Sequence, residues 1–518
     1  MATTPAVHSR QKKPLIVNAF VEMCTGHQSP GLWRHPDDES WKFNDLDHWV
    51  KLAKLLEEAK FHGIFIADVL GGYDVYKNSL DPAVISGAQW PVNEPLSVVP
   101  AMAAATKNIG FGVTISTTYE QPYHLARRLA TVDHLTKGRL GWNIVTSYLD
   151  SAARNIHGKA TQLAHDDRYA QAEEYMKVMY KLFQSSWRDD AVILDRERGV
   201  YTDPALVRQI NHKGKFFDVP GPAITQPSPQ RTPLLLQAGT SRAGKIFAAQ
   251  HAEAIFTSAH SPAVCAKSIT EIRELARTEF GRDGNKIKVL ALVTPILGRT
   301  EEEAQAKHAE YRKYASTEGA LALFGGWTGI DLNQYGDDEE LREVESNAVK
   351  STVTGYAKFA PQNSKWTKHT VAEHVAIGGN GPIIVGTPEQ VADGLERWVE
   401  EGGVDGFNFV SLFFVDNEDN GKANTGYRRM PFSHNPSRIS SSCFFRSFGS
   451  VGFSGMATPF QVARTARTST ASRGRSTHYL STLLPSSSGG QVCRLKSTRF
   501  PNSWDGLSDA ESLPRGNN

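Results

Sequence analysis

The sequence predicts an α/β protein that folds as a closed (β/α)8 TIM barrel. The first observation is that, from residue 14 onward, short β-rich apolar runs alternate with amphipathic helical stretches, the pattern of a parallel sheet covered by helices. The second is that eight such runs occur, which favours a closed barrel over an open dinucleotide-binding sheet. The third is that a chain of 518 residues, 40% of them hydrophobic, can bury the large core that a barrel needs.

The predicted strands and helices follow one another along the chain. The strands are expected at residues 15–20, 63–68, 109–116, 140–146, 234–238, 254–257, 289–296 and 406–410. The helices are expected at residues 45–60, 96–106, 123–136, 241–251, 263–280 and 388–401. Thr387 precedes the last of these helices as a capping residue and Pro388 occupies its first turn, so both favour a helix start there.

Two segments between predicted strands are too long to be simple barrel loops, at about residues 150–232 and 301–386. Because long insertions at the mouth of a barrel commonly build its pocket, we expect both to contribute to a binding site. The barrel domain with its insertions is predicted to span residues 14–410, after a disordered N-terminus at residues 1–13.

Composition and cysteine spacing exclude several classes of protein. No stretch approaches the roughly 18 to 20 uninterrupted apolar residues of a membrane-spanning helix, and the N-terminal residues lack the apolar core of a secretion signal. The irregular spacing of Cys24, Cys265, Cys443 and Cys493 forms neither a disulfide framework nor a zinc site. We therefore expect a cytoplasmic protein with free thiols, no metal site and no membrane partner.

Polar residues end several predicted strands, and a barrel brings such residues together. Asp68, Thr114 and Asn143 lie at or near strand ends, and Gly239, Thr240 and Ser241 follow the fifth strand. In a parallel barrel all carboxyl ends face the same way, so these groups should converge on one mouth, where barrel chemistry occurs.

The segment 239–244, Gly-Thr-Ser-Arg-Ala-Gly, opens a helix directly after a strand. Backbone N–H groups, the Ser241 hydroxyl and the helix dipole can hold a phosphate there. The alternative is an ordinary capping turn, which needs only Thr240 or Ser241.

The sequence resembles the nitrilotriacetate, dibenzothiophene-sulfone and long-chain alkane monooxygenase group of the bacterial-luciferase-like flavin enzymes. Ten matching stretches occur in the order and spacing of that family, over roughly residues 14–410. They lie at residues 18–20, 31–36, 67–76, 116–120, 133–139, 142–147, 165–169, 227–233, 237–241 and 325–332. The resemblance implies a luciferase-like barrel.

The resemblance also implies the activity. Members of this group take reduced FMN from a separate NAD(P)H:flavin reductase and use O2 to oxygenate a small organic substrate, and they often pair into dimers or tetramers. The sequence has no Gly-x-Gly-x-x-Gly nicotinamide fingerprint after a strand, as expected for an enzyme that does not reduce flavin itself. Two alternatives remain, a flavin-binding barrel without turnover and an oxidoreductase of the same superfamily that depends on coenzyme F420.

The resemblance assigns cofactor-binding roles to strand-end residues. Asp68, Thr114 and Asn143 are implied contacts of the isoalloxazine ring or the ribityl hydroxyls. Tyr169 is an implied contact of the phosphate or the ribityl chain, and His165, Gly239, Thr240 and Ser241 complete the cofactor-binding set. Asp68 could instead cap the next helix, Asn143 could brace neighbouring loops, and Tyr169 could simply pack its ring.

The resemblance implies a catalytic group on the substrate side of the flavin, made of Cys24, His27, Tyr73 and Gln89. His27 is the candidate for donating a hydrogen bond or moving a proton, because an unperturbed imidazole titrates near neutrality. It could also be a solvated loop histidine. Cys24 is interpreted as a small residue of the pocket wall in preference to a nucleophile.

The sequence departs from the alkane-oxidising type at two places. Tyr148 and the stretch 320–324 stand where that type has histidines, which argues against alkane hydroxylation. Aromatic residues are expected to line the pocket, namely Trp90, Tyr148, Phe324 and Trp327. Such a pocket suits an organosulfur compound, a hydrophobic amine or a secondary metabolite.

The C-terminal segment 411–518 differs from the family. Residues 421–518 carry 13 Lys and Arg against 3 Asp and Glu, a net charge of +10, whereas residues 1–420 carry −8. A basic tail can bind nucleic acid, but this one has no aromatic-basic periodicity and no recognisable motif, so no nucleic-acid partner is expected.

This segment is Ser-, Arg- and Thr-rich without a period, which predicts either a disordered low-complexity tail or a misframed translation. Val410 and Ser411 can be encoded by a common splice-donor sequence. Moving the codon boundaries by one base over residues 436–469 permits a Leu- and Ile-rich helix and a family-like ending. The last barrel helix is therefore predicted to be missing.

Overall fold

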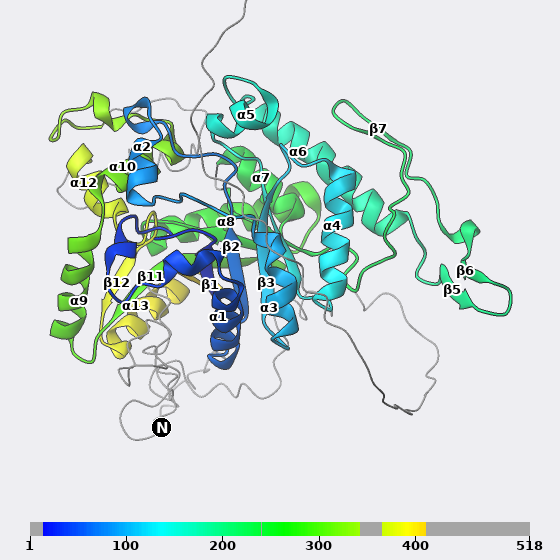
Figure 1. Ribbon diagram of the computed structural model, residues 1–518, viewed down its shortest axis with the longest axis horizontal. Coiled ribbons are helices and arrows are strands. Elements are labelled where there is room, and N and C mark those ends of the chain that lie inside the picture. Colours follow the sequence, from blue (N-terminus) through cyan, green and yellow to red (C-terminus); the bar gives the residue numbers. More distant parts are fainter. Residues whose placement is uncertain (1–13, 240, 342–364, 411–518) are drawn as a thin grey trace, which may run out of the picture. The chain divides into compact units, whose positions relative to one another are not determined.

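The protein folds as a closed barrel of eight parallel strands with helices around it. A computed structural model describes residues 14–239, 241–341 and 365–410 (Figure 1). The barrel strands are β1 (Ile16–Glu22), β2 (Gly63–Ala67), β3 (Gly110–Ser116), β4 (Leu140–Val145), β9 (Leu234–Gln237), β10 (Ala254–Thr257), β11 (Lys288–Leu297) and β13 (Gly406–Val410). Each lies within two residues of a predicted strand, and the predicted (β/α)8 fold is confirmed.

Strand pairing closes the barrel without a free edge. β1 pairs in parallel with β2 on one side and with β13 on the other, and β10 pairs with β11. A further strand, β12 (Ile383–Gly386), extends the pairing along the second half of β11. Closure matters for function because it gathers all eight carboxyl ends at one mouth.

Alternation along the strands divides their side chains between two cores. Inward-facing side chains such as Phe20, Phe65 and Phe256 fill the barrel, while the outward-facing ones pack beneath the helices. A Cβ atom at Gly112 would lie 2.7 Å from a side-chain carbon of Leu236, so the packed interior requires glycine there.

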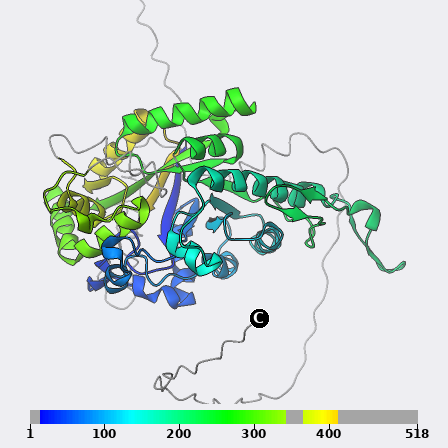
Figure 2. The same ribbon diagram turned by 90° about the horizontal axis from the view of Figure 1, so that it is seen from above.

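Helices cover the outside of the barrel between successive strands (Figures 1 and 2). They are α1 (Leu46–Glu58), α3 (Val99–Ala104), α4 (Pro122–Leu135), α6 (His165–Tyr180), α7 (Arg242–His251), α8 (Pro262–Phe280) and α13 (Pro388–Glu400). The helix expected at residues 96–106 is broken into a 3-10 turn over Pro95–Ser97 and the shorter α3. The break follows from Pro100, which lacks an N–H and is tolerated only in a first helical turn.

The segment predicted as the first insertion contains the helix that follows β4. α5 (Asp150–His157) precedes α6, and α6 packs Tyr175 and Met176 into the core beneath the barrel helices. Two short hairpins come next, β5 (Val192–Asp195) with β6 (Val200–Thr202), and β7 (His212–Lys213) with β8 (Asp218–Val219). Both hairpins lie away from the barrel, on the right of Figure 1.

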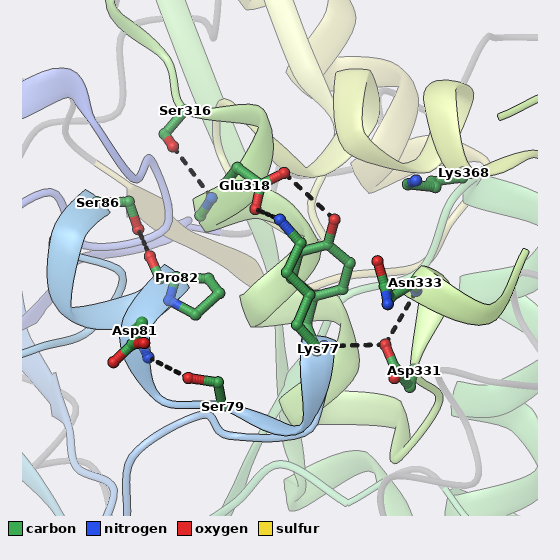
Figure 3. A network of polar contacts seen from close by, with 12 residues as sticks. Lys77, Ser79, Asp81, Pro82, Ser86, Ser316, Glu318, Asp331, Asn333 and Lys368 are labelled. Carbon is green, nitrogen blue, oxygen red and sulfur yellow. Dashed lines mark hydrogen bonds and ion pairs between the residues drawn. The ribbon is translucent and has the colours of Figure 1, made fainter.

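The segment predicted as the second insertion forms a small helical layer. α9 (Glu301–Tyr314) and α10 (Thr317–Thr328) precede α12 (Lys368–Val375), and α10 packs against α12 and against α2 (Asp81–Ser86). Figure 3 shows Glu318 of α10 facing Lys77, with Nζ 2.5 Å from the carboxylate. The carboxylate of Asp331 accepts a hydrogen bond from the backbone N–H of Lys77 at 3.0 Å. These contacts attach the helical layer to the loop after β2.

Several predictions fall on residues outside the described ranges. They are the disordered N-terminus at residues 1–13, the role of Thr240, and the tail at residues 411–518 with the missing last helix. Within the described ranges, no helix combines the length and the apolar character that crossing a membrane requires.

Candidate active site

A cavity of about 240 Å³ opens at the carboxyl ends of β2, β4 and β9. Its wall is formed by the residues that follow these strands and by α5, α6 and the start of α7. Five of the predicted cofactor-binding residues line it, namely Asp68, His165, Tyr169, Gly239 and Ser241. The barrel topology thus brings together residues that are up to 173 positions apart in the sequence.

The turn between β9 and α7 forms one end of the cavity. Ser241 is the N-cap of α7, and its Oγ accepts the backbone N–H of Gly244 at 3.1 Å. The same Oγ lies 3.2 Å from Nε2 of His165, and the hydroxyl of Tyr169 hydrogen-bonds to the side chains of Ser241 and Thr146. Side chains of α6 therefore hold the start of α7 in place.

Close approach at this turn requires glycine. A Cβ atom at Gly239 would lie 2.6 Å from the Tyr169 hydroxyl and 2.5 Å from Nε2 of Gln237. A Cβ atom at Gly244 would lie 2.8 Å from the carbonyl of Gly239. The turn after β9, the start of α7 and the ring of Tyr169 are thus packed closely together.

Arg168 adds positive charge to this end of the cavity, and the sequence analysis did not single it out. Its guanidinium is buried, lines the cavity and donates from Nη1 to the carbonyl of Leu163 at 2.6 Å. Burial lowers the pKa of Arg168 from its ordinary value, yet a guanidinium stays protonated in proteins. In the sequence, only its position within the matched segment 165–169 indicates that Arg168 lies near the cofactor site.

Asp68 brings a carboxyl to the opposite side of the cavity, at the end of β2. Burial, together with the negative charges of Glu22 and Glu94, raises the pKa of Asp68 to about 8. At pH 7 the carboxyl therefore keeps its proton and can donate a hydrogen bond to a polar ring edge.

Thr114 and Asn143 lie opposite each other on β3 and β4. Both are buried, and Nδ2 of Asn143 donates to Oγ1 of Thr114 at 2.9 Å. Neither is among the residues that line the cavity. Oδ1 of Asn143 is buried and has no hydrogen-bond partner among the described residues.

The predicted catalytic residues gather around a carboxyl that the sequence analysis missed. Glu22 ends β1 and is buried; its Oε2 accepts a hydrogen bond from Nε2 of Gln89. Sγ of Cys24 lies 3.5 Å from the same oxygen, and Nε2 of His27 lies 3.8 Å from it. The strand runs two residues beyond its predicted end at Phe20, which carries Glu22 into the mouth.

Burial sets the protonation of this group. It raises the pKa of Glu22 to about 7 and raises the pKa of the Cys24 thiol well above its ordinary value. Burial lowers the pKa of His27 to about 3, far below the ordinary value near neutrality on which its candidate role was based. His27 acts as a neutral imidazole, and its ring packs edge-on against Phe20.

A pair of tyrosines connects the cavity with the residues around Glu22. The hydroxyls of Tyr73 and Tyr148 lie 2.9 Å apart, and Tyr148 also lines the cavity. Tyr73 is buried against α10, where a Cβ atom at Gly326 would lie 1.7 Å from its ring, and its hydroxyl hydrogen-bonds to Trp327. Of the expected aromatic wall, Tyr148 lines the cavity, while Trp327 packs behind it.

These features define an α/β-barrel protein with a polar cavity at the mouth, where barrel enzymes carry out their chemistry. The sequence profile of the luciferase-like monooxygenase family matches residues 20–406, and the chain belongs to this family. The protein is therefore a flavin-dependent monooxygenase, an enzyme that uses reduced flavin and O2.

Similar proteins agree with this assignment. The chain is 50% identical over 399 residues to a dimethyl-sulfide monooxygenase from Hyphomicrobium sulfonivorans, covering 77% of this chain and 82% of that protein. It is 46% identical over 408 residues to a long-chain alkane monooxygenase from Geobacillus thermodenitrificans, covering 78% and 88%. The crystal structure of DmoA from Hyphomicrobium sulfonivorans superposes with a TM-score of 0.71 at 50% identity, over 77% of this chain and 84% of that one.

Proposed function

We propose that the protein is the oxygenase component of a two-component system. In this role it binds FMN that a separate NAD(P)H:flavin reductase has reduced, and it transfers one oxygen atom of O2 to a small organic substrate. The proposal is supported by the family assignment and by relatives named as monooxygenases of dimethyl sulfide and of long-chain alkanes. An apolar organosulfur compound and an amine are both compatible with the aromatic wall.

The observation that carries the FMN assignment is the capped start of α7. Ser241, the N-cap of α7, lines one end of the cavity together with Tyr169 and Arg168, whose side chains bring a hydroxyl and a guanidinium. Positive charge and hydrogen-bond donors at a helix N-terminus bind a phosphate dianion. His165 hydrogen-bonds to Ser241 and orients its hydroxyl.

The remaining cofactor-binding residues suit the polar edge of the ring and the ribityl chain. The protonated carboxyl of Asp68 offers a donor, and Oδ1 of Asn143 offers a buried acceptor whose orientation Thr114 fixes. A hydrogen-bond donor and an acceptor in a low-dielectric site discriminate strongly among ring edges.

When bound, the flavin supplies the two electrons and the site at which O2 is activated. The protein's residues contribute binding, orientation and the exclusion of water. Burial keeps the Cys24 thiol protonated and the His27 imidazole neutral, so neither side chain places a charge beside the substrate. Tyr73 and Tyr148 close the site with an aromatic wall.

Oxygen uptake with supplied reduced FMN tests this function. An unrelated NADH:flavin reductase provides reduced FMN, and we expect O2 uptake with a thioether present to match the oxygenated product formed. A binding protein without turnover would release peroxide equal to the O2 consumed and form no product from any member of a thioether, amine and alkane panel. The predicted dimer or tetramer is tested separately by light scattering during gel filtration.

A further inference from the structure

Three buried polar atoms around the end of β1 have no hydrogen-bond partner among the described residues. They are Oε1 of Glu22, Oε1 of Gln89 and Nε2 of His27. The side chains that carry them are 2%, 4% and 7% exposed. A buried polar atom without a partner costs free energy, and such atoms mark places where a ligand completes the hydrogen bonding.

The protein fixes these atoms firmly. Nε2 of Gln89 donates to Oε2 of Glu22, which leaves the second oxygen of the carboxyl and the amide oxygen free. The loops that carry the side chains are also joined: Cys24 and Val92 form a β-bridge, and the backbone N–H of Asn93 donates to the carbonyl of Met23 at 2.9 Å. The three atoms therefore form a preorganised set.

All three atoms accept hydrogen bonds. His27 is neutral, and it hydrogen-bonds to the backbone of Phe20 through its other ring nitrogen, so that Nε2 carries a lone pair. The amide oxygen of Gln89 and the carboxyl oxygen of Glu22 are acceptors as well. The three acceptors lie around one carboxyl, since Gln89 donates to Oε2 of Glu22 and Nε2 of His27 lies 3.8 Å from that oxygen. Their number equals that of the N–H donors of one ammonium group.

No described cation balances Glu22. Among the described ion pairs, His27 is its sole partner, and that imidazole is neutral. Four titratable groups interact electrostatically with Glu22, namely Cys24, Asp68, Tyr73 and Tyr148. Each is neutral when protonated and negatively charged when deprotonated, so none supplies a positive charge. Two of these groups, Asp68 and Tyr148, line the cavity.

We infer that Glu22, Gln89 and His27 form a substrate subsite for an ammonium group, so that the preferred substrate carries a protonated amine beside the atom that is oxygenated. This inference rests on the proposed function and narrows its substrate class. It separates this chain from a relative named for dimethyl sulfide, because dimethyl sulfide has no hydrogen-bond donor. Glu22 is the specificity-determining residue.

A series of thioethers of equal length tests the subsite. The probes are 2-(methylthio)ethylamine, 2-(methylthio)ethanol, methyl propyl sulfide and 3-(methylthio)propionate, which differ only in the terminal group. Binding is measured by calorimetry at pH 8, on the flavin-free and the FMN-loaded protein, and kcat/KM is measured alongside. We expect the ammonium probe to bind at least about tenfold more tightly than methyl propyl sulfide, because a hydrogen bond to a charged group contributes that much. The carboxylate probe should bind most weakly.

Substitutions at Glu22 assign the preference to this residue. Glu22→Met replaces the carboxyl with an apolar group of similar length and should abolish or invert the ammonium preference. Glu22→Gln keeps an acceptor but removes the charge, so it should weaken binding of the ammonium probe about tenfold and leave that of the alcohol nearly unchanged. Glu120→Gln serves as a control, because Glu120 pairs with Arg128 and should not affect the preference.

Equal or tighter binding of methyl propyl sulfide by the wild-type protein would overturn the inference, as would an ammonium preference that survives in Glu22→Met. If Glu22→Met does not fold, an unchanged affinity of Glu22→Gln for the ammonium probe overturns it equally. Failure of the proposed function looks different: FMN then does not bind, while the thioether series on the flavin-free protein still reports on the subsite.

Discussion

Ser241 caps α7 and also faces the proposed phosphate site, so its substitution should affect both stability and flavin binding. Ser241→Ala removes the acceptor for the Gly244 N–H and a donor to the phosphate. We expect the free energy of unfolding to fall by about 1 kcal/mol and the Kd for FMN to rise about tenfold. Chemical denaturation and a fluorescence titration measure the two quantities.

Ser261 provides a matched control, because it caps α8 in the same way, with Oγ accepting the Val264 N–H at 3.4 Å, and it does not line the cavity. Ser261→Ala should cost similar stability and leave the Kd for FMN unchanged. Equal FMN affinities for the Ser241 and Ser261 variants would contradict a phosphate site at α7.

Asp68 should make the flavin-free protein less stable as the pH rises. The pKa of Asp68 is raised from 3.8 to about 8 in the folded state, so between these values the folded state holds a proton that the unfolded chain has lost. Stability must then decrease with rising pH through this window, on the order of 4 kcal/mol between pH 5 and pH 8. The negative charges of Glu22, Glu94 and Glu120 also raise the pKa of this carboxyl and act in the same direction.

Asp68→Asn removes the titration, so the variant should be more stable than the wild type above pH 5, by an amount that grows up to pH 8. Urea denaturation at half-unit pH intervals gives the comparison. Parallel stability curves for the two proteins across this range would show that Asp68 is not held protonated.

At the level of residues, the sequence predicted several of the side chains that line the cavity. Asp68, Ser241 and Tyr169 could be predicted because a parallel barrel sends strand ends to one mouth and because the resemblance covers their motifs. Glu22 was missed because an apolar strand is not expected to end in a buried carboxyl. The low pKa of His27 was also missed, since it depends on burial by residues distant in the sequence.

At the scale of elements, α10 positions the aromatic wall through a glycine. A Cβ atom at Gly326 would lie 1.7 Å from the ring of Tyr73, a buried side chain that cannot easily move. Alanine normally stabilises a helix relative to glycine by about 1 kcal/mol, but here overpacking should reverse the sign. We expect Gly326→Ala to destabilise the protein by about 2 kcal/mol and to reduce kcat/KM, measured by thermal unfolding and oxygen uptake.

Gly394 in α13 is the control for this prediction. A Cβ atom there meets the side chain of Ile384 at 3.1 Å, and a flexible side chain can shift. Gly394→Ala should therefore change stability by less than about 1 kcal/mol. Stabilisation by Gly326→Ala would refute the close packing of α10 on Tyr73.

Elements with strong local signals were predicted, and those that depend on tertiary contacts were not. The eight strands are apolar runs that alternate with helices, so their number and order could be predicted from the pattern alone. The β7–β8 hairpin has no such signal: the carboxylate of Glu174 accepts the backbone N–H groups of Lys215, Phe216 and Phe217 and thereby shapes the turn. No local sequence pattern reports a carboxylate on a distant helix.

At the scale of the whole molecule, the two ends of the barrel should serve different purposes. Asp405 lies just before β13. Its carboxylate accepts hydrogen bonds from Nη2 of Arg273 at 2.9 Å and from the backbone N–H of Val289 at 3.0 Å. Its backbone carbonyl accepts a hydrogen bond from the N–H of Ile16 at 3.0 Å. It thus joins the amino ends of three strands, at the face opposite the cavity.

Asp405→Ala should lower the free energy of unfolding by about 2 kcal/mol, because it leaves partly buried donors unpaired. The Kd for FMN should change by less than about twofold, since residues at the amino-terminal face of a barrel contribute to stability and not to catalysis. A loss of FMN affinity comparable to that of Ser241→Ala would contradict this separation.

The most direct test of the central claim is an anaerobic titration of the purified protein with oxidised and with reduced FMN. We predict saturable binding of one FMN per chain, with riboflavin, which lacks the phosphate, bound at least about tenfold more weakly. Absence of binding in both redox states would contradict the assignment of the barrel mouth as a flavin site.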